Sequence, residues 1–284
     1  MPNSKPTEIL ESIAGLPARY DLALCDVWGV LHNGHAAFPD ASGALVRLRR
    51  AGVTVILLTN APRPAKEVAL QLTRLGFSAD GYDAIVTSGD ITKALVRRFA
   101  GKPLYHLGPA RDAGLFEGTD AHLTTPELAE AVICTGLFDD TSETADTYRA
   151  TLEGFVARQL PFVCANPDLV VERNGVLIPC AGALAKRYGE LGGEVLYAGK
   201  PYRPVYEHAI ALGERLRGAT GLRVLAIGDG IATDMKGAFG MGLDALFIPS
   251  EVNVPRGEVL SAALIDTLFR ELPGRPVAAI ERLR

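Results

Sequence analysis

The stretch that decides the fold is LALCDVWGVLHNG, residues 22–34. A short apolar run ends abruptly in Asp26, and Gly29 and Gly34 follow, so the pattern predicts a buried strand that ends in an acid and continues into a glycine-containing loop. Ligands of open α/β sheets bind beyond the carboxyl ends of the strands, which puts Asp26 where a substrate would lie. On this segment alone, two interpretations stay open. Asp26 either attacks phosphorus or binds a hard cation, or it only caps a turn.

Short β-rich runs alternate with amphipathic helices along nearly the whole chain, which is typical of an α/β protein. The runs are continuously apolar rather than alternating, so we expect strands that are buried on both faces. The clearest expected strands are residues 20–25, 53–58, 84–87, 131–135, 161–165, 195–198, 223–227 and 245–248. The prediction is an α/β fold with a Rossmann-like, doubly wound parallel sheet at its core.

Two segments, residues 26–60 and 199–234, contain most of the residues that suggest chemistry. The stretch between them has its own expected strands and helices, and its segment 170–178 reads as a β-hairpin with Asn174-Gly175 at the turn. We therefore expect a core formed by residues 1–87 and 197–284, with residues 88–196 inserted as a second α/β domain.

The composition excludes several classes of protein. The 284 residues are 48% hydrophobic and carry a net charge of −4 without a long basic run, which argues against a nucleic-acid binder. No run of 18 apolar residues predicts a membrane helix, and the polar start lacks the apolar region of a signal peptide. The four cysteines are far apart, as expected for buried, reduced thiols, namely Cys25, Cys134, Cys164 and Cys180. We expect a cytoplasmic protein with no nucleic-acid or membrane partner.

Two further strand ends carry polar residues that suit a phosphoryl group. VILLTN ends in Thr59 and Asn60, whose hydroxyl and backbone N–H are donors for a phosphoryl oxygen, although Thr-Asn is also common in turns. After another short strand, the sequence YAGKP contains Lys200, which supplies a point charge for phosphate and can restrain the carboxylate of Asp26. Taken alone, Lys200 reads equally well as a solvated surface lysine.

The segment VLAIGDGIATDMKGA, residues 224–238, is the strongest signal. A strand again ends in an acid, Asp229, and Asp234 follows in the turn that enters a helix. Closely placed carboxylates repel one another unless a cation neutralises them, so the pattern indicates a Mg²⁺ site. The alternative is that Asp234 or Thr233 only caps the helix. The spacing matches neither a Rossmann fingerprint nor a Walker A loop.

In chain order, four strand ends carry Asp26, Thr59, Lys200 and the pair Asp229 and Asp234. This order resembles the haloacid dehalogenase superfamily, whose fold places a nucleophilic Asp, a Thr or Ser, a Lys and a metal-binding acid pair on one sheet edge. The insertion, the loop CANPDLVVERNG (164–175) and the sequence PCAGALAKRYGE (179–190) resemble the class IIA branch with its large α/β cap. That branch includes pyridoxal phosphate phosphatases and 4-nitrophenylphosphatases. A response-regulator receiver domain has similar strand ends but is much shorter.

The resemblance implies a role for each matching residue. Asp26 would be the nucleophile and a metal ligand, with Lys200 as its catalytic partner. The remaining implied ligands fall into three groups: the Mg²⁺ ligands Trp28 (backbone carbonyl), Asp229 and Asp234; the phosphoryl ligands Thr59, Asn60 and Lys200; and the substrate-facing cap loop Asn166, Pro167 and Asp168. The implied partner is a small phosphorylated molecule, and caps of this branch often form homodimers.

Trp28 departs from the family's pattern. In the phosphatases of the superfamily, the residue two positions after the nucleophile is normally a second Asp that protonates the leaving alcohol. Indole has no usable acid function, and loss of a general acid costs about 10²–10⁴ in rate. Three interpretations remain open. The substrate has a good leaving group, another residue such as His32 supplies the proton, or the site binds phosphate ligands without turnover. The indole could also form one wall of an aromatic pocket.

The other motif residues favour chemistry over binding alone. A pure binding site has no need of a strand-end Asp in addition to the metal acids and the lysine. The sequence therefore predicts a Mg²⁺-dependent hydrolase that acts on a small phosphorylated metabolite through an aspartyl-phosphate. The alternative is a catalytically impaired protein that binds phosphorylated metabolites and descends from such an enzyme.

Overall fold

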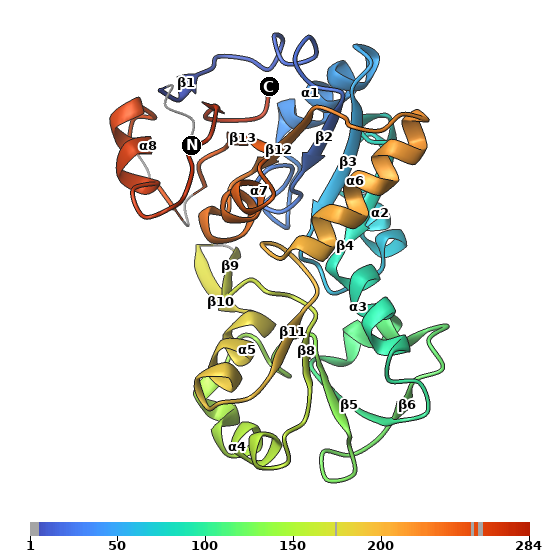
Figure 1. The fold of residues 1–284 in the computed structure, drawn as a ribbon. Coiled ribbons are helices and arrows are strands. Elements are labelled where there is room, and N and C mark those ends of the chain that lie inside the picture. Colours follow the sequence, from blue (N-terminus) through green and yellow to red (C-terminus); the bar gives the residue numbers. More distant parts are fainter. Residues whose placement is uncertain (1–5, 174, 251–252, 255–257) are drawn as a thin grey trace. The chain divides into compact units, whose positions relative to one another are not determined.

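The computed structural model describes residues 6–173, 175–250, 253–254 and 258–284 (Figure 1). Within these ranges the chain forms two compact units. The first unit comprises Met1–Thr59, Val68–Val86 and Tyr206–Arg284, and the second comprises Asn60–Glu67 and Thr87–Val205. The expected insert was residues 88–196, whereas the second unit runs on to Val205 and also takes in residues 60–67.

The first unit is built on a seven-stranded sheet. Its pairings from β1 through β3 are parallel, which confirms the expected α/β fold with a parallel sheet. In spatial order the strands are β1 (Glu8–Ile9), β14 (Ala278–Ala279), β13 (Asp244–Phe247), β12 (Val224–Gly228), β2 (Leu22–Cys25), β3 (Thr54–Thr59) and β4 (Ala84–Thr87). The helical segments are α1 (Pro39–Arg50), α2 (Ala65–Arg74), η1 (Ala79–Gly81), α6 (Arg203–Arg217), η4 (Ile231–Met235), α7 (Lys236–Gly240) and α8 (Ala262–Leu268).

The direction of winding reverses between β2 and β12. From β2 the chain moves outward through β3 to β4, and from β12 it moves the other way through β13 to β14. Every residue of β2, β3 and β12 is buried, as expected for continuously apolar strands in the middle of a sheet. Two neighbouring parallel strands whose connections leave in opposite directions open a crevice at their carboxyl ends. The fold therefore places the ends of β2 and β12 at such a crevice.

The second unit contains a five-stranded parallel sheet and a two-stranded antiparallel ribbon. The sheet order is β11 (Val195–Tyr197), β8 (Phe162–Cys164), β7 (Ala131–Cys134), β5 (Pro103–Leu107) and β6 (His122–Leu123). The ribbon pairs β9 (Val170–Arg173) with β10 (Val176–Pro179), where the sequence predicts a hairpin; Asn174 of the expected turn lies outside the described residues. The helical segments are α3 (Ser88–Arg97), η2 (Ala110–Phe116), η3 (Ala145–Tyr148), α4 (Arg149–Ala157) and α5 (Ala181–Glu190).

Successive residues of β7 belong to two different apolar clusters. Val132 and Cys134 belong to a cluster that includes residues of α4 and α5, such as Leu152. Ala131 and Ile133 belong to a second cluster, with residues of α3 and η2. Side chains alternate between the faces of a strand, so a strand covered on both faces has to be apolar throughout. The two clusters therefore agree with the continuously apolar sequence of this strand.

The strand before Lys200 belongs to this second sheet. The sequence, read through its family resemblance, predicts that Lys200 follows a strand of the same sheet as Asp26, and this prediction is wrong. β11 pairs with β8, with Val195 opposite Phe162 and Tyr197 opposite Cys164. The sequence of a three-residue apolar strand does not show which strand it pairs with, because the pairing depends on the tertiary contacts of both faces of the strand.

No helix among the residues that the structure describes combines the length and the apolar character that crossing a membrane requires.

Gly213 allows α6 to lie close to β2. A Cβ atom built at Gly213 would lie 2.6 Å from a Cδ atom of Leu22, whose side chain is completely buried. Gly154, on the exposed side of α4, has no neighbouring atom within 4 Å of such a Cβ atom. Gly213 and Gly154 therefore both lie within helices, but only Gly213 is closely packed against another element.

We expect Gly213→Val to lower the free energy of unfolding by about 1–3 kcal/mol, because it overpacks the contact with Leu22. Gly154→Val serves as the matched control and should leave stability within about 0.5 kcal/mol, since it changes an exposed helix position. Thermal unfolding followed by circular dichroism measures both variants. Equal melting temperatures for the two would contradict the close approach of α6 to β2.

Candidate active site

Three site residues lie at the ends of neighbouring strands of the first sheet. Asp26 directly follows β2, and its N–H donates to the carbonyl of Ile227 in β12 at 2.8 Å. Asp229 directly follows β12, and Thr59 is the last residue of β3. Asp26 and Thr59 are 7% and 5% exposed, so neither is an ordinary surface turn residue.

The carboxylates of Asp26, Asp229 and Asp234 form one cluster, in which one oxygen from each lies within 4.8 Å of the others. At this separation each pair of negative charges repels by about 3–4 kcal/mol if the effective dielectric constant is about 20. Asp26 and Asp234 are buried, so water relieves little of this repulsion. Three carboxylate oxygens are ligands that Mg²⁺ and Ca²⁺ prefer, and the residues therefore fit a hard divalent cation.

Local backbone features hold the two acids of the DGIATD segment. Gly29 has φ +83°, and a Cβ atom there would lie 2.4 Å from Oδ2 of Asp229. At the end of β12, a Cβ atom on Gly228 would lie 2.3 Å from Cγ of Asp234. Both positions therefore need glycine, because the carboxylates occupy the space of a side chain.

Hydrogen bonds fix the same segment. The N–H of Gly230 donates to Oδ2 of Asp234 at 3.1 Å, and the Tyr206 hydroxyl donates to the carbonyl of Asp234 at 3.2 Å. Asn253 donates to the carbonyl of Asp229 at 2.8 Å. Residues 231–235 form a π-helical turn, a form that often marks functional sites. Asp234 thus accepts the N-terminal hydrogen bond of its own turn and is also a member of the acid cluster.

The indole of Trp28 is packed against the loop that follows it. A Cβ atom on Gly34, which has φ +93°, would lie 2.5 Å from the edge of the indole. His32 contacts the indole edge to face, with ring centroids 5.2 Å apart, and its Nδ1 accepts the N–H of Gly34 at 2.9 Å. His32 is only 2% exposed. These contacts give His32 a structural role in orienting Trp28.

Four predicted site residues come together in the second unit. The side chain of Asn60 accepts the N–H of Lys200 at 2.7 Å, and its amide donates to the carbonyl of Lys200 at 3.1 Å and to Asp168 at 2.9 Å. The N–H of Asp168 in turn donates to the side chain of Asn166 at 3.1 Å. Asn60 therefore clamps the backbone of Lys200 and links it to the Asn166–Asp168 loop.

Lys200 is not the solvated surface lysine that its short motif equally allows. It is 2% exposed, and lysines are almost never buried to this extent unless they serve a paired charge. The side-chain amide of Asn60 is committed to Lys200 and Asp168, so its expected contact with a phosphoryl group is left to its backbone N–H.

The predicted residues thus fall into two sets. The first unit holds Asp26, Trp28, Thr59, Asp229 and Asp234, and the second holds Asn60, Asn166, Asp168 and Lys200. Sequence reasoning missed the supports of these sets, because the supporting residues are distant in the chain. Tyr206 and Asn253 carry no motif, and the signal of Gly34 is only that of a loop glycine.

Comparison with known proteins indicates the family. A family model described as haloacid dehalogenase-like hydrolase matches residues 23–121, and a second, described as HAD-hydrolase-like, matches residues 197–267. Chronophin from Bos taurus is 30% identical over 239 residues, which cover 75% of each protein.

Two solved structures extend the comparison. A haloacid dehalogenase-like hydrolase from Brucella suis is 43% identical, with a TM-score of 0.86 and coverage of 97% of this chain and 100% of that one. A glycerol phosphate phosphatase from Mycobacterium tuberculosis, solved in complex with magnesium, is 25% identical, with a TM-score of 0.65 and coverage of 88% and 74%.

Parallel strands followed directly by Asp26 and by Asp229 define an α/β protein that carries carboxylates at the carboxyl edge of its sheet. The comparisons narrow this class: the chain belongs to the haloacid dehalogenase-like hydrolase family, in its class IIA branch. It is a hydrolase of the phosphatase type.

Trp28 is the single tryptophan of the chain, so its fluorescence reports directly on this loop. We expect Gly34→Val to displace the indole and to shift its emission to longer wavelength, because the new side chain needs the space that the indole edge occupies. Gly52→Val is the matched control. Gly52 has a similar φ of +89° but no atom within 4 Å of a built Cβ atom. An identical emission spectrum for Gly34→Val and the wild type would contradict the packing of Trp28.

Proposed function

We propose that the chain is a Mg²⁺-dependent phosphatase that forms an aspartyl-phosphate on Asp26 and prefers phosphorylated metabolites with good leaving groups. The observation that carries the proposal is the cluster of Asp26, Asp229 and Asp234, whose ligand oxygens lie within 4.8 Å of one another beside a switch point of the sheet. Thr59, at the end of the neighbouring strand, supplies a hydroxyl for the phosphoryl group.

The metal would be held by carboxylate oxygens of Asp26, Asp229 and Asp234 and by the backbone carbonyl of Trp28. When bound, Mg²⁺ supplies neutralisation of the charge on the phosphoryl oxygens and on the attacking carboxylate. The glycerol phosphate phosphatase, which is solved with magnesium and also with calcium, supports a hard divalent cation in this role.

In the first chemical step, a carboxylate oxygen of Asp26 attacks phosphorus. The new P–O bond to Asp26 forms as the bond to the leaving group breaks, and the leaving oxygen keeps the electron pair. Water then attacks the phosphorus of the aspartyl-phosphate, loses a proton to solvent and releases inorganic phosphate, which restores the carboxylate. The family resemblance predicts that Lys200 supplies a positive charge to the phosphoryl group, and within the second unit Asn60 fixes the backbone of Lys200.

The preference for good leaving groups follows from Trp28. The leaving oxygen of an alkyl ester needs a proton, and Trp28 stands in the chain where the family's acid would supply it. Aryl esters, acyl phosphates and anhydrides leave as stable anions and depend less on a proton donor. The tight packing of His32 inside the loop supports a structural role for it over that of a replacement acid. The reduced, buried cysteines fit activity in the cytoplasm.

With Mg²⁺ present, we expect phosphate release from aryl and acyl phosphates to exceed release from alkyl esters. Asp26→Asn should abolish release, because an amide is no nucleophile for phosphorus. Trp28→Asp should raise kcat/KM for alkyl esters by up to about 10²-fold, the lower range of general-acid effects. Phosphate release from a substrate panel, measured for the wild type and both variants, checks all three expectations.

Two outcomes would overturn this assignment. Binding of phosphate ligands without release from any compound would identify the chain as a non-catalytic binder of phosphorylated metabolites. Unchanged alkyl-ester activity in Trp28→Asp would show that the missing acid does not limit the enzyme.

Removal of one carboxylate should have opposite effects with and without metal. Without metal, Asp229→Asn should raise the melting temperature, because it relieves repulsion within the acid cluster. With Mg²⁺, the same variant should bind the ion at least about ten-fold more weakly, which reduces the stabilisation gained from binding. Thermal unfolding over a range of Mg²⁺ concentrations measures both effects. Asp40→Asn, an exposed acid in the first turn of α1, is the control. An equal Mg²⁺ response in Asp229→Asn and in the wild type would refute the metal site.

A further inference from the structure

The side chain of Asn60 links the main chain of Lys200 to the carboxylate of Asp168. Its Oδ1 accepts the N–H of Lys200 at 2.7 Å, and its Nδ2 donates to the carbonyl of Lys200 at 3.1 Å and to Oδ1 of Asp168 at 2.9 Å. Both N–H donors of the amide are thus used. A hydrogen bond to a carboxylate is about twice as strong as one between neutral groups, so Asp168 restrains Asn60 strongly.

Close packing leaves the Asn60 side chain little freedom to move. Asn60 is 3% exposed and Lys200 is 2% exposed. A Cβ atom built on Gly199 would lie 2.3 Å from Oδ1 of Asn60 and 2.9 Å from Cδ of Pro167. The main chain directly before Lys200 is therefore in close contact with both Asn60 and the loop that carries Asp168. A shift of the Asn60 amide has to move this main chain as well.

The loop that carries Asp168 packs closely against the start of α5. A Cβ atom built on Gly182, in the first turn of α5, would lie 2.3 Å from the carbonyl oxygen of Pro167 and 2.4 Å from that of Asp168. The carbonyl of Leu169 accepts the N–H of Cys180, the residue before α5, at 3.0 Å. These contacts fix the main chain on both sides of Asp168.

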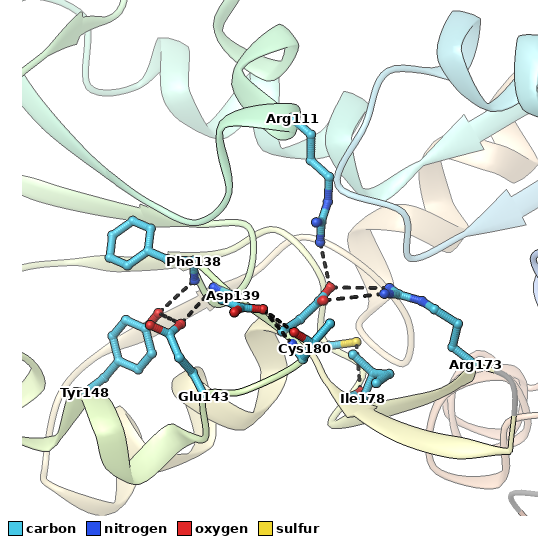
Figure 2. A network of polar contacts seen from close by, with 10 residues as sticks. Arg111, Phe138, Asp139, Glu143, Tyr148, Arg173, Ile178 and Cys180 are labelled. Carbon is cyan, nitrogen blue, oxygen red and sulfur yellow. Dashed lines mark hydrogen bonds and ion pairs between the residues drawn. The ribbon is translucent and has the colours of Figure 1, made fainter.

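The strand that follows this loop is anchored as well. Arg173, at the end of β9, donates to the two carboxylate oxygens of Asp140 at 3.3 and 3.4 Å, and Arg111, in η2, donates to the same carboxylate at 2.6 Å (Figure 2). Burial raises the pKa of Asp140, but the hydrogen bonds from Arg173 and Arg111 outweigh it and keep the pKa below its usual value. The carboxylate is therefore charged at neutral pH, and its ion pairs hold the ribbon. This makes Asp168 a fixed support for Asn60.

We infer that Asp168 is a positioning residue, whose carboxylate holds the side chain of Asn60 and, through it, the main chain of Lys200; its effect on activity rests on the function proposed above. The family resemblance predicts that the loop of Asp168 faces the substrate, and the role inferred here is an additional one. A lysine places its charge at the end of a flexible stem, so a fixed main chain limits where that charge acts. All of these contacts lie within the second unit.

The main chain and the side chain of Asp168 have separable roles. The contacts of the loop with Gly182, Cys180 and the side chain of Asn166 are made by main-chain atoms, whereas the contact with Asn60 is made by the carboxylate. A substitution of the side chain therefore removes the restraint on Asn60 and leaves these main-chain contacts in place.

The experiment is a double-mutant cycle of Asp168→Ala and Asn60→Ala, with kcat/KM measured on an aryl phosphate and on an acyl phosphate. Each single variant should lower kcat/KM by about ten-fold or more, the effect of losing a hydrogen bond to a charged group. The double variant should lose no more than the weaker single variant, because Asp168 acts through Asn60. Both substrates should show the same factor. Asp168→Asn, which keeps an acceptor oxygen, should recover most of the activity.

The matched control is Asp146→Ala, which removes an acid of the same unit whose side chain is 84% exposed and should leave kcat/KM unchanged. Losses that add in the double variant, or a loss in Asp168→Ala that differs between the two substrates, would overturn the inference in favour of direct substrate contact. A lower melting temperature of Asp168→Ala with unchanged kcat/KM would also overturn it, since the residue would then be structural only.

If the wild type releases no phosphate from any compound, the proposed function fails by itself, and amide hydrogen exchange at Lys200 decides the inference. Asn60 protects this N–H from exchange. Exchange should become about ten-fold faster or more in Asp168→Ala and in Asn60→Ala, with no further increase in the double variant. An unchanged exchange rate in Asp168→Ala would refute the inference, as would effects that multiply in the double variant.

Discussion

The mutual repulsion of three carboxylates is the constraint on which the first unit depends. Asp26, Asp229 and Asp234 lie within 4.8 Å of one another, and their surroundings keep them there in spite of their like charge. Parallel pairing of β2 with β12 brings Asp26 and Asp229 to one edge of the sheet. The glycines at positions 29 and 228 leave room for the carboxylates, and the π-helical turn 231–235 places Asp234 beside the other two acids. Three carboxylates held this close together fit a hard divalent cation, which would relieve their repulsion.

The second unit has a different electrostatic constraint, because it buries the charged side chain of Lys200. Lys200 sits at the edge of a sheet whose strands are covered on both faces, and the side chain of Asn60 fixes its backbone from both sides of the residue. The lysine is thus positioned by a residue 140 places earlier in the chain. In the same unit, Arg111 after β5 and Arg173 at the end of β9 both donate to Asp140, so each of these cations is held by an acid or an amide.

The sequence predicts much of this because strand ends carry strong local signals. Apolar runs that stop at Asp26, Thr59 and Asp229 reveal both the strands and the chemistry, and the spacing of Asp229 and Asp234 indicates a cation. The sheet that a short strand joins is not determined by its local sequence, so the sequence did not predict that β11 belongs to the second sheet. The same holds for Asp140 and its arginines, which come from three separate elements and form no motif. Trp28 is predictable only in part. The sequence shows that it departs from the family's pattern, but not that its indole packs against Gly34, because this packing depends on the positive φ of Gly34.

The boundary between the two units, which falls between Thr59 and Asn60, limits which segments relatives could exchange. These two residues are neighbours in sequence, yet the first belongs to the acid-bearing unit and the second to the unit that holds the lysine. The segment 88–196 is therefore not a self-sufficient module, because Asn60 and Lys200 lie outside it. An exchange of inserts between relatives, by recombination or by a designed chimera, would separate Asn60 and Lys200 from Asp168, which accepts a hydrogen bond from Asn60. The unit that is exchangeable without this loss is the discontinuous one, residues 60–67 together with 87–205, which contains Asn60, Asp168 and Lys200.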